Sequence, residues 1–312
     1  MIPACFSQPS TPSSISHLPQ NLVTSIYQTQ LCNSPTYLTL SWSRTLFSHS
    51  LLIFATDTFS ITISLNPSSF SFFRTRPGSK SIYLTHTHKR VHKIKLYWDF
   101  SRTRFTHSSA EPESCFYFAI SCNGKLEFFL GDLFHDLTRR SSRLITTHPP
   151  PDPILLSRRE HVFGSRNYTS RAQFLGSKHE IEIECDEGVL KVKVDGHISL
   201  VVKRLAWKFR GNERIFIDGI EVEFYWDVFG WVNDSNGNGH GVFVFQVGDG
   251  GVWPEMVGPE KRLIRKSLSS SSSVLQWAEE SSDGGRSSCS SSTRSCGSNG
   301  GFSLLLYAWR RD

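Results

Sequence analysis

The sequence predicts an all-β protein in which two related antiparallel β-units pack as a sandwich or as a fused barrel pair. Two observations predict this fold class. Apolar and polar residues alternate with a period of two along much of residues 21–131 and 154–247, which is the pattern of half-buried strands. In addition, one seven-residue strand pattern occurs once in each of these segments, which indicates an internal repeat.

The first β-unit, residues 21–131, follows a Ser- and Pro-rich segment, residues 1–20, that we expect to be a disordered leader. Its expected strands are rich in β-branched and aromatic residues, and turn-forming residues separate them. They cover residues 22–27, 37–42, 50–56, 59–65, 91–100, 115–122 and 125–131.

Residues 132–153 interrupt the strand pattern and end with four prolines in the five positions 149–153. Because proline lacks an N–H donor and fixes φ, we expect a linker or a long surface loop. The second β-unit, residues 154–247, opens with a candidate short helix at residues 154–163. Its expected strands, several of them joined by Asp-Gly turns, cover residues 168–175, 179–185, 189–194, 199–203, 214–217, 220–228 and 241–247.

Residues 248–300 are expected to form a disordered tail, since residues 267–298 contain 15 Ser in 32 positions and few apolar side chains. The motif Arg265-Lys266-Ser267 is typical of a kinase substrate, so phosphorylation of the tail is a hypothesis. Residues 301–312 are apolar again. We expect them to dock on the body as a last strand, with a short linear ligand as the alternative.

The repeated pattern reads apolar, charged, apolar, Tyr, Trp, Asp, apolar. Its motif residues are Tyr97, Trp98 and Asp99 in the first copy, and Tyr225, Trp226 and Asp227 in the second. Strand alternation places the Tyr and Asp of each copy on the outward face, beside Lys93 and Lys95 in the first copy and beside Glu223 in the second. We therefore hypothesise that Lys95 and Glu223 approach each other across a pseudo-twofold axis.

These motifs, in their order along the chain, resemble a plant family classed as domain of unknown function 868. The resemblance covers about residues 22–247 and the C-terminal segment. It rests on Tyr27-Gln28-Thr29, Tyr97-Trp98-Asp99-Phe100, Leu130-Gly131-Asp132-Leu133, Arg159-Glu160-His161-Val162-Phe163-Gly164, Trp207-Lys208-Phe209-Arg210-Gly211-Asn212, Phe224-Tyr225-Trp226-Asp227-Val228 and residues 301–310. It implies a plant intracellular protein and supplies no catalytic residues; the sequence departs from the family pattern at residues 70–76 and 85–92.

Basic residues predominate in the first third of the chain. Residues 1–110 contain ten Lys and Arg against Asp57 and Asp99, which favours an acidic partner. The candidates for nucleic-acid binding lie in residues 74–104 and include Arg74, Arg76, Lys93 and Lys95. A second aromatic and basic group, Trp207, Lys208 and Arg210, either stacks on bases or covers a sheet edge.

The sequence predicts neither an enzyme nor a metal or cofactor site. His86, His88 and His92 lack a nearby Cys, Asp or Glu in the sequence to complete a metal site. No nucleophile motif accompanies the pair Glu160 and His161. The seven cysteines are odd in number and form no Cys-x-x-Cys, so we expect reduced cysteines, with Cys122 behaving as a small apolar residue on a strand.

These observations favour a non-enzymatic binding or scaffold protein that recognises another protein through β-sheet surfaces. Nucleic-acid binding through residues 74–104 is the first alternative, and a small ligand or an enzymatic activity in a cleft between the repeats is the second. The expected location is the cytoplasm or nucleus. The acid-poor, Ser- and Thr-rich N-terminus leaves the chloroplast as an alternative.

Overall fold

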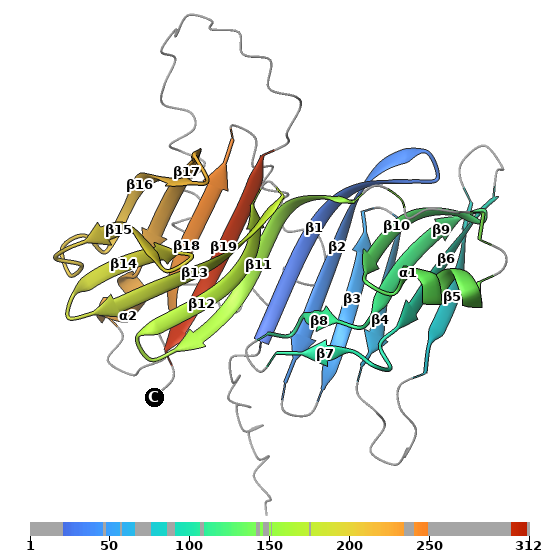
Figure 1. Cartoon of the computed structure of the whole chain (residues 1–312), viewed down its shortest axis with the longest axis horizontal. Helices are drawn as coiled ribbons and strands as arrows, with labels where there is room; N and C mark the ends of the chain where they lie inside the picture. The colour runs from blue at the N-terminus through green and yellow to red at the C-terminus, as the bar shows by residue number, and fades with distance from the viewer. Residues whose placement is uncertain are drawn as a thin grey trace, which may run out of the picture.

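In the computed structural model, a nine-stranded sheet runs through the molecule and is shared by both β-units (Figure 1). In order across the sheet, its strands are β16 (Arg210–Ile217), β17 (Ile220–Asp227), β18 (His240–Val247), β19 (Phe302–Arg310), β11 (Ile154–Gly164), β1 (Asn21–Leu31), β2 (Ser34–Arg44), β3 (His49–Ala55) and β4 (Phe59–Ser64). Neighbouring strands are antiparallel except β11 and β19, which are parallel.

The structure describes residues 21–45, 48–56, 58–65, 76–85, 91–106, 109–141, 144–145, 150, 152–174, 176–233, 240–248 and 301–310. The predicted leader, nearly all of the predicted tail with its kinase motif, and Arg74 lie outside these residues. Neither of the helices within them is long and apolar enough to cross a membrane.

Two four-stranded antiparallel sheets pack against the nine-stranded sheet. The first consists of β10 (Lys125–Gly131), β9 (Tyr117–Cys122), β6 (Val91–Asp99) and β5 (Gly78–Thr85), and the second of β12 (Asn167–Phe174), β13 (Ser177–Asp186), β14 (Val189–Val194) and β15 (His197–Val202). The remaining elements are the small ribbon of β7 (Arg104–Phe105) and β8 (Pro112–Ser114), and the short helices α1 (Phe134–Arg140) and α2 (Phe229–Asn233). The predicted all-β fold class is therefore confirmed.

Each β-unit has its own apolar core, and both cores lie on the same face of the shared sheet. Val23 of β1 lies opposite Glu160 of β11, and Glu160 lies opposite Leu306 of β19. Paired residues on adjacent strands share a face. Since Val23 belongs to the first core and Leu306 to the second, the molecule is two sandwiches side by side on one continuous layer.

The prediction of a short helix at residues 154–163 is wrong, because this segment forms β11. Three consecutive charged residues, Arg158, Arg159 and Glu160, conceal its strand alternation, and all three are buried. The segment expected to be a linker or a long surface loop, residues 132–153, also contains α1. Leu137 of this helix packs on Tyr97 and Tyr117 of the first unit, so part of the segment is integral to the fold.

The hypothesis that Lys95 and Glu223 meet is also wrong. Lys95 lies on β6, in the first four-stranded sheet, whereas Glu223 lies on β17, next to the far end of the nine-stranded sheet (Figure 1). The two units contact each other through β1 and β11 instead. The prediction that the tyrosines of the two motifs lie on a solvent-exposed strand face is wrong as well, since Tyr97 and Tyr225 are both buried.

A buried network of charged and polar side chains lies where the two sandwiches meet. The Arg158 guanidinium on β11 donates to Glu111 of the first unit at 2.5 Å and pairs with Glu160 at 3.5 Å. Ser170 of β12 donates to Glu160 at 2.7 Å. Burial raises the pKa of Glu160, and the Arg158 charge and the Ser170 hydroxyl oppose this shift. The network therefore links residues of both units across β11.

We predict that Arg158→Ala lowers the free energy of unfolding by about 3–5 kcal/mol, because it leaves the buried Glu160 carboxylate without its cation. Chemical denaturation followed by tryptophan fluorescence measures this change. Arg166→Ala is the matched control, since it removes an exposed ion pair with Asp186 and should cost less than about 1 kcal/mol. Equal losses in the two variants would contradict the prediction.

Candidate functional site

Four exposed apolar side chains lie on the two edge strands of the second sandwich and on the loop between them, with Ile198 and Val201 on the outer face of one sheet and Phe216 on the outer face of the other. Strand β15 is the last strand of its four-stranded sheet, and β16 is the terminal strand of the nine-stranded sheet. The loop of residues 203–209 joins them. Four of the exposed large hydrophobic residues lie on this stretch of chain, namely Ile198, Val201, Trp207 and Phe216. We call these four residues, with the two strands and their loop, the β15–β16 edge.

Trp207 is the most exposed of these side chains, at 86% of its full accessible area. Its backbone is nevertheless fixed, because the carbonyl oxygen of Arg204 accepts the N–H groups of Trp207 and Lys208 at 2.9 and 3.0 Å. Leu205, in the same turn, is buried in the second core. A rigid turn thus presents a large aromatic ring to solvent, an arrangement typical of binding surfaces.

The charged residues around Trp207 are mainly basic. Lys203, Arg204 and Lys208 are exposed, and none of the ion pairs found among the described residues includes them. Arg210 is different, because it donates to Asp227 at 2.8 Å and lies over the ring of Phe229. Of the predicted group, Trp207 and Lys208 therefore face solvent as binding residues would, whereas Arg210 also serves the fold.

The predicted basic face of the first unit is partly visible in the structure. On β6, Lys93 lies over the ring of Tyr83 at 5.7 Å and Lys95 over the ring of Tyr97 at 4.7 Å. Arg76 is exposed just before β5. Lys93, Lys95 and Tyr83 thus form a small aromatic and basic surface, which lies on a different sheet from the β15–β16 edge.

The two Tyr-Trp-Asp motifs occupy matching structural positions. Trp98 lies opposite Gly78, and Trp226 lies opposite Gly211; a Cβ on either glycine would overlap the indole. In both copies the Asp closes a turn: Asp99 accepts the N–H of Ser101 at 3.0 Å, and Asp227 accepts that of Phe229 at 2.9 Å.

Both motif carboxylates also bind an arginine. Asp99 accepts from Arg140 of α1 at 2.7 Å, and Asp227 accepts from Arg210 of β16 at 2.8 Å. Both Asp side chains are buried. These hydrogen bonds and ion pairs account for Asp99 and Asp227 as residues that stabilise the fold.

His161 and Gly164, the other motif residues, lie on β11. The imidazole of His161 packs on the rings of Tyr307 and Trp309 of β19, with centroids 5.4 and 6.1 Å apart. A Cβ at Gly164 would overlap the carbonyl oxygen of Asn167, so glycine allows β11 to bend into β12. The structure therefore keeps these two residues apart from both candidate surfaces.

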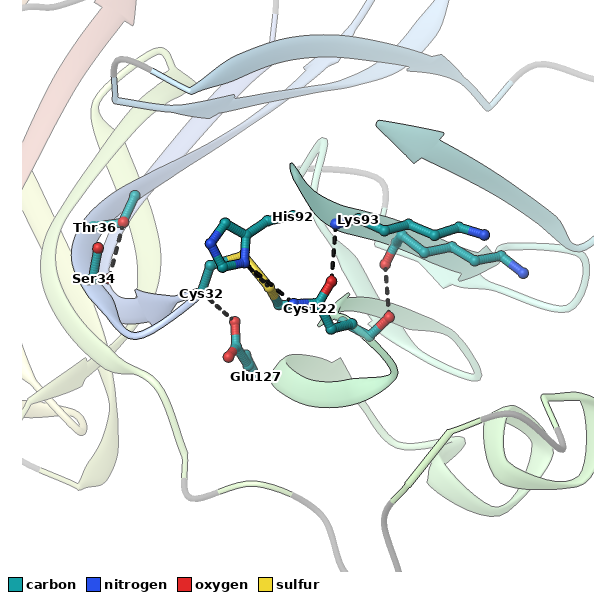
Figure 2. Close-up of a disulfide and its surroundings, with 10 residues drawn as sticks. Cys32, Ser34, Thr36, His92, Lys93, Cys122 and Glu127 are labelled. Carbon is teal, nitrogen blue, oxygen red and sulfur yellow. Dashed lines mark hydrogen bonds between the residues drawn. A yellow bond between two sulfur atoms is a disulfide. The ribbon is translucent and has the colours of Figure 1, made fainter. Parts of the chain in front are cut away.

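A disulfide joins Cys32 to Cys122, with His92 beside it (Figure 2). Cys32 lies in the turn between β1 and β2, and Cys122 ends β9, so the bond links the nine-stranded sheet to the first four-stranded sheet. The expectation that Cys122 is a reduced, apolar strand residue is wrong in this structure. Cys115 and Cys185 are free.

Polar groups surround the disulfide. The Nδ1 atom of His92 lies 4.0 Å from the Cys122 sulfur, and the Glu127 carboxylate accepts the backbone N–H of Cys32 at 2.7 Å. Burial raises the pKa of Glu127, and the Cys32 N–H together with the charges of Lys125 and His92 opposes this shift.

The sequence analysis missed three residues of the β15–β16 edge and the partners of His92. Of the edge residues, Phe216 carried a usable signal, because Asn212 and Arg214 on the same face of its strand are polar. Ile198 and Val201 lie in a largely apolar strand that offers no such contrast. Cys32 and Cys122 carried no signal, since they are separated by 90 positions and only the packing of two sheets brings them together.

This architecture defines an all-β protein of two sandwiches on a shared sheet. The chain belongs to the family described as plant protein of unknown function (DUF868), whose model matches residues 18–310. The comparisons with curated proteins and with solved structures gave no match.

We predict that, in the oxidised and metal-free protein, Cys32→Ser lowers the free energy of unfolding by about 2–4 kcal/mol, because it opens a long covalent loop in the unfolded chain. Denaturant titrations with and without a reducing agent measure this difference. Cys115→Ser is the control and should unfold like the parent protein. If the loss from Cys32→Ser were as large under reducing conditions, the disulfide would not be its source.

Proposed function

We propose that this protein is a non-enzymatic binding or scaffold protein that recognises an extended, acidic and apolar segment of another protein at the β15–β16 edge. The observation that carries this proposal is the 86% exposed Trp207 on the loop between two terminal strands, which themselves carry the exposed Ile198, Val201 and Phe216.

Edge strands suit this kind of recognition. A terminal strand has N–H and C=O groups on one side that are unpaired within its sheet, and an added strand can bind them. Alternate side chains of the added strand then point to the same side and can contact apolar residues along the edge. Trp207, fixed on its turn between the two terminal strands, supplies the large aromatic anchor that dominates many such interfaces.

The charge of the surface indicates the chemistry of the segment. Lys203, Arg204 and Lys208 surround Trp207 and are exposed. An acidic segment would pair with these groups and associate faster than a neutral one. We therefore assign the binding partner as a protein with an extended segment in which apolar and acidic residues alternate.

We predict that peptides selected from a displayed random library on the full chain will alternate apolar and acidic residues. Trp207→Ala should weaken their binding about 30-fold or more, as expected for an aromatic anchor worth at least about 2 kcal/mol. Fluorescence anisotropy with the selected peptides measures the affinities.

Tyr83→Ala is the matched control, because Tyr83 is also an exposed aromatic residue, 63% accessible, on the first unit. Its affinities should equal those of the parent protein. Peptides that bind the Trp207→Ala variant as tightly as the parent would overturn the assignment of this edge.

We propose nucleic-acid binding as a second candidate function, favoured by the aromatic and basic surface of Lys93, Lys95 and Tyr83. Lysines interleaved with an exposed ring can neutralise phosphates and stack a base. This surface is separate from the β15–β16 edge, so variants distinguish the two functions.

If this second function holds, binding to single-stranded RNA should weaken steeply between 50 and 200 mM salt, because phosphate contacts release counterions. The double change of Lys93 and Lys95 to Glu should abolish binding and leave peptide binding unchanged. Anisotropy with a labelled oligonucleotide provides the measurement. RNA binding that Lys93 and Lys95 do not affect would contradict this candidate.

We also interpret the two sandwiches as copies of one ancestral unit. The support is the matching Gly–Trp pairs of β5 and β6 and of β16 and β17. In addition, the Asp of each motif binds an arginine, from α1 in the first copy and from β16 in the second. Under this interpretation, the nine-stranded sheet contains β1–β4 from the beginning of the first copy and β16–β19 from the end of the second.

A further inference from the structure

Three potential metal ligands from distant parts of the sequence meet at one place in the first sandwich. The Sγ atoms of Cys32 and Cys122 and a ring nitrogen of His92 all lie within 4.8 Å of one another. They come from the β1–β2 turn, the end of β9 and the start of β6 (Figure 2). Sulfur and imidazole nitrogen are the ligands that Zn²⁺ prefers in proteins.

We propose that the reduced protein binds one Zn²⁺ through the Cys32 and Cys122 thiolates and the His92 imidazole, and that the disulfide is the oxidised, metal-free state of the same site. A water molecule completes the tetrahedral set. This assignment is independent of the binding function proposed for the β15–β16 edge, which lies on the other unit.

The backbone geometry suits both states. The Cα atoms of Cys32 and Cys122 are 5.5 Å apart. In a tetrahedral zinc site with Zn–S distances of about 2.3 Å, the two sulfur atoms stand roughly 3.8 Å apart. Rotation of two cysteine side chains about their Cα–Cβ bonds provides a separation of this order, so the strands need little movement between the two states.

The backbone around Cys32 is held in a conformation that few non-glycine residues adopt. Cys32 and Asn33 have positive φ angles of 54° and 64°, and together they form the tight turn between β1 and β2. The Glu127 carboxylate secures this turn by accepting the Cys32 N–H at 2.7 Å. This turn places the Cys32 side chain beside His92 and Cys122.

The interconversion is a balanced two-electron reaction with a peroxide as the oxidant. Two zinc-bound thiolates lose two electrons and form the S–S bond. Hydrogen peroxide accepts these two electrons together with two protons, its O–O bond breaks, and two molecules of water form. Zn²⁺ is released because a disulfide sulfur is a poor ligand compared with a thiolate.

This assignment gives the site a role in a reducing compartment as well as in an oxidising one. Disulfides are rare in the cytosol, where closely placed cysteines more commonly bind metal. In either state, a link between the β1–β2 turn and β9 holds the two sheets of the first sandwich together.

The test uses the full chain with Cys5, Cys289 and Cys296 replaced by Ser, since these cysteines lie outside the described residues and could bind zinc independently. The protein is reduced, freed of metal, and titrated with Zn²⁺ against a chromophoric chelator. We expect one tightly bound Zn²⁺ per chain, loss of binding in Cys32→Ser and Cys122→Ser, and at least 10-fold weaker binding in His92→Ala.

Cys115→Ser and Cys185→Ser are the matched controls, because both cysteines are free in the structure, and both variants should retain one Zn²⁺. Zinc that remains bound in the Cys32→Ser/Cys122→Ser double variant, or a reduced protein that binds none, would overturn the proposal.

A second measurement requires no variant of the site and covers the case in which Cys32→Ser fails to fold. Zn²⁺ should slow alkylation of Cys32 and Cys122 in the reduced chain at least 10-fold and leave the rates at Cys115 and Cys185 unchanged, as measured by peptide mapping. Hydrogen peroxide should then release one Zn²⁺ for each Cys32–Cys122 disulfide formed. Equal alkylation rates with and without zinc would refute the site.

Discussion

The position of β11 at the middle of the nine-stranded sheet is the constraint on which the rest of the structure depends. This strand pairs with β1 on one side and with β19 on the other, so it is the backbone link between the two sandwiches. Its core-side residues Arg158 and Glu160 lie between Leu155, which packs against both apolar cores, and Val162 of the second core, and they satisfy each other's charge together with Glu111. Buried charged groups at the junction thus lie on the same strand as the residue that contacts both apolar cores.

The elements with simple alternation could be predicted from the sequence, because one of their faces meets a core and the other is more polar. Strand β14 is an example: Leu190, Val192 and Val194 are buried between less buried lysines. Strand β11 could not be predicted in this way, since its charged residues Arg158, Arg159 and Glu160 are buried. The helix prediction for this segment failed because it assumed that charged side chains always lie on the solvent-exposed face of a strand.

The candidate sites also differ in whether the sequence could predict them. Trp207 and Lys208 could be found because an aromatic residue among basic residues is a local pattern, and local patterns survive without knowledge of the fold. The Cys32, Cys122 and His92 cluster could not, since each residue lies on a different element and the cluster exists only once the first sandwich has closed. The error over Lys95 and Glu223 has a related origin, because a shared strand pattern says nothing about which sheets of the two units pair.

The place of β19 has a consequence for how the chain acquires its structure during synthesis. Strand β18 ends at Val247, yet its neighbour in the sheet begins only at Phe302. A nascent chain that has emerged as far as β18 can form the first sandwich, while the edges of β18 and β11 that later pair with β19 remain open. Such edges promote pairing with the wrong chain, so the interval before β19 arrives is the stage at which molecular chaperones would matter most for this protein.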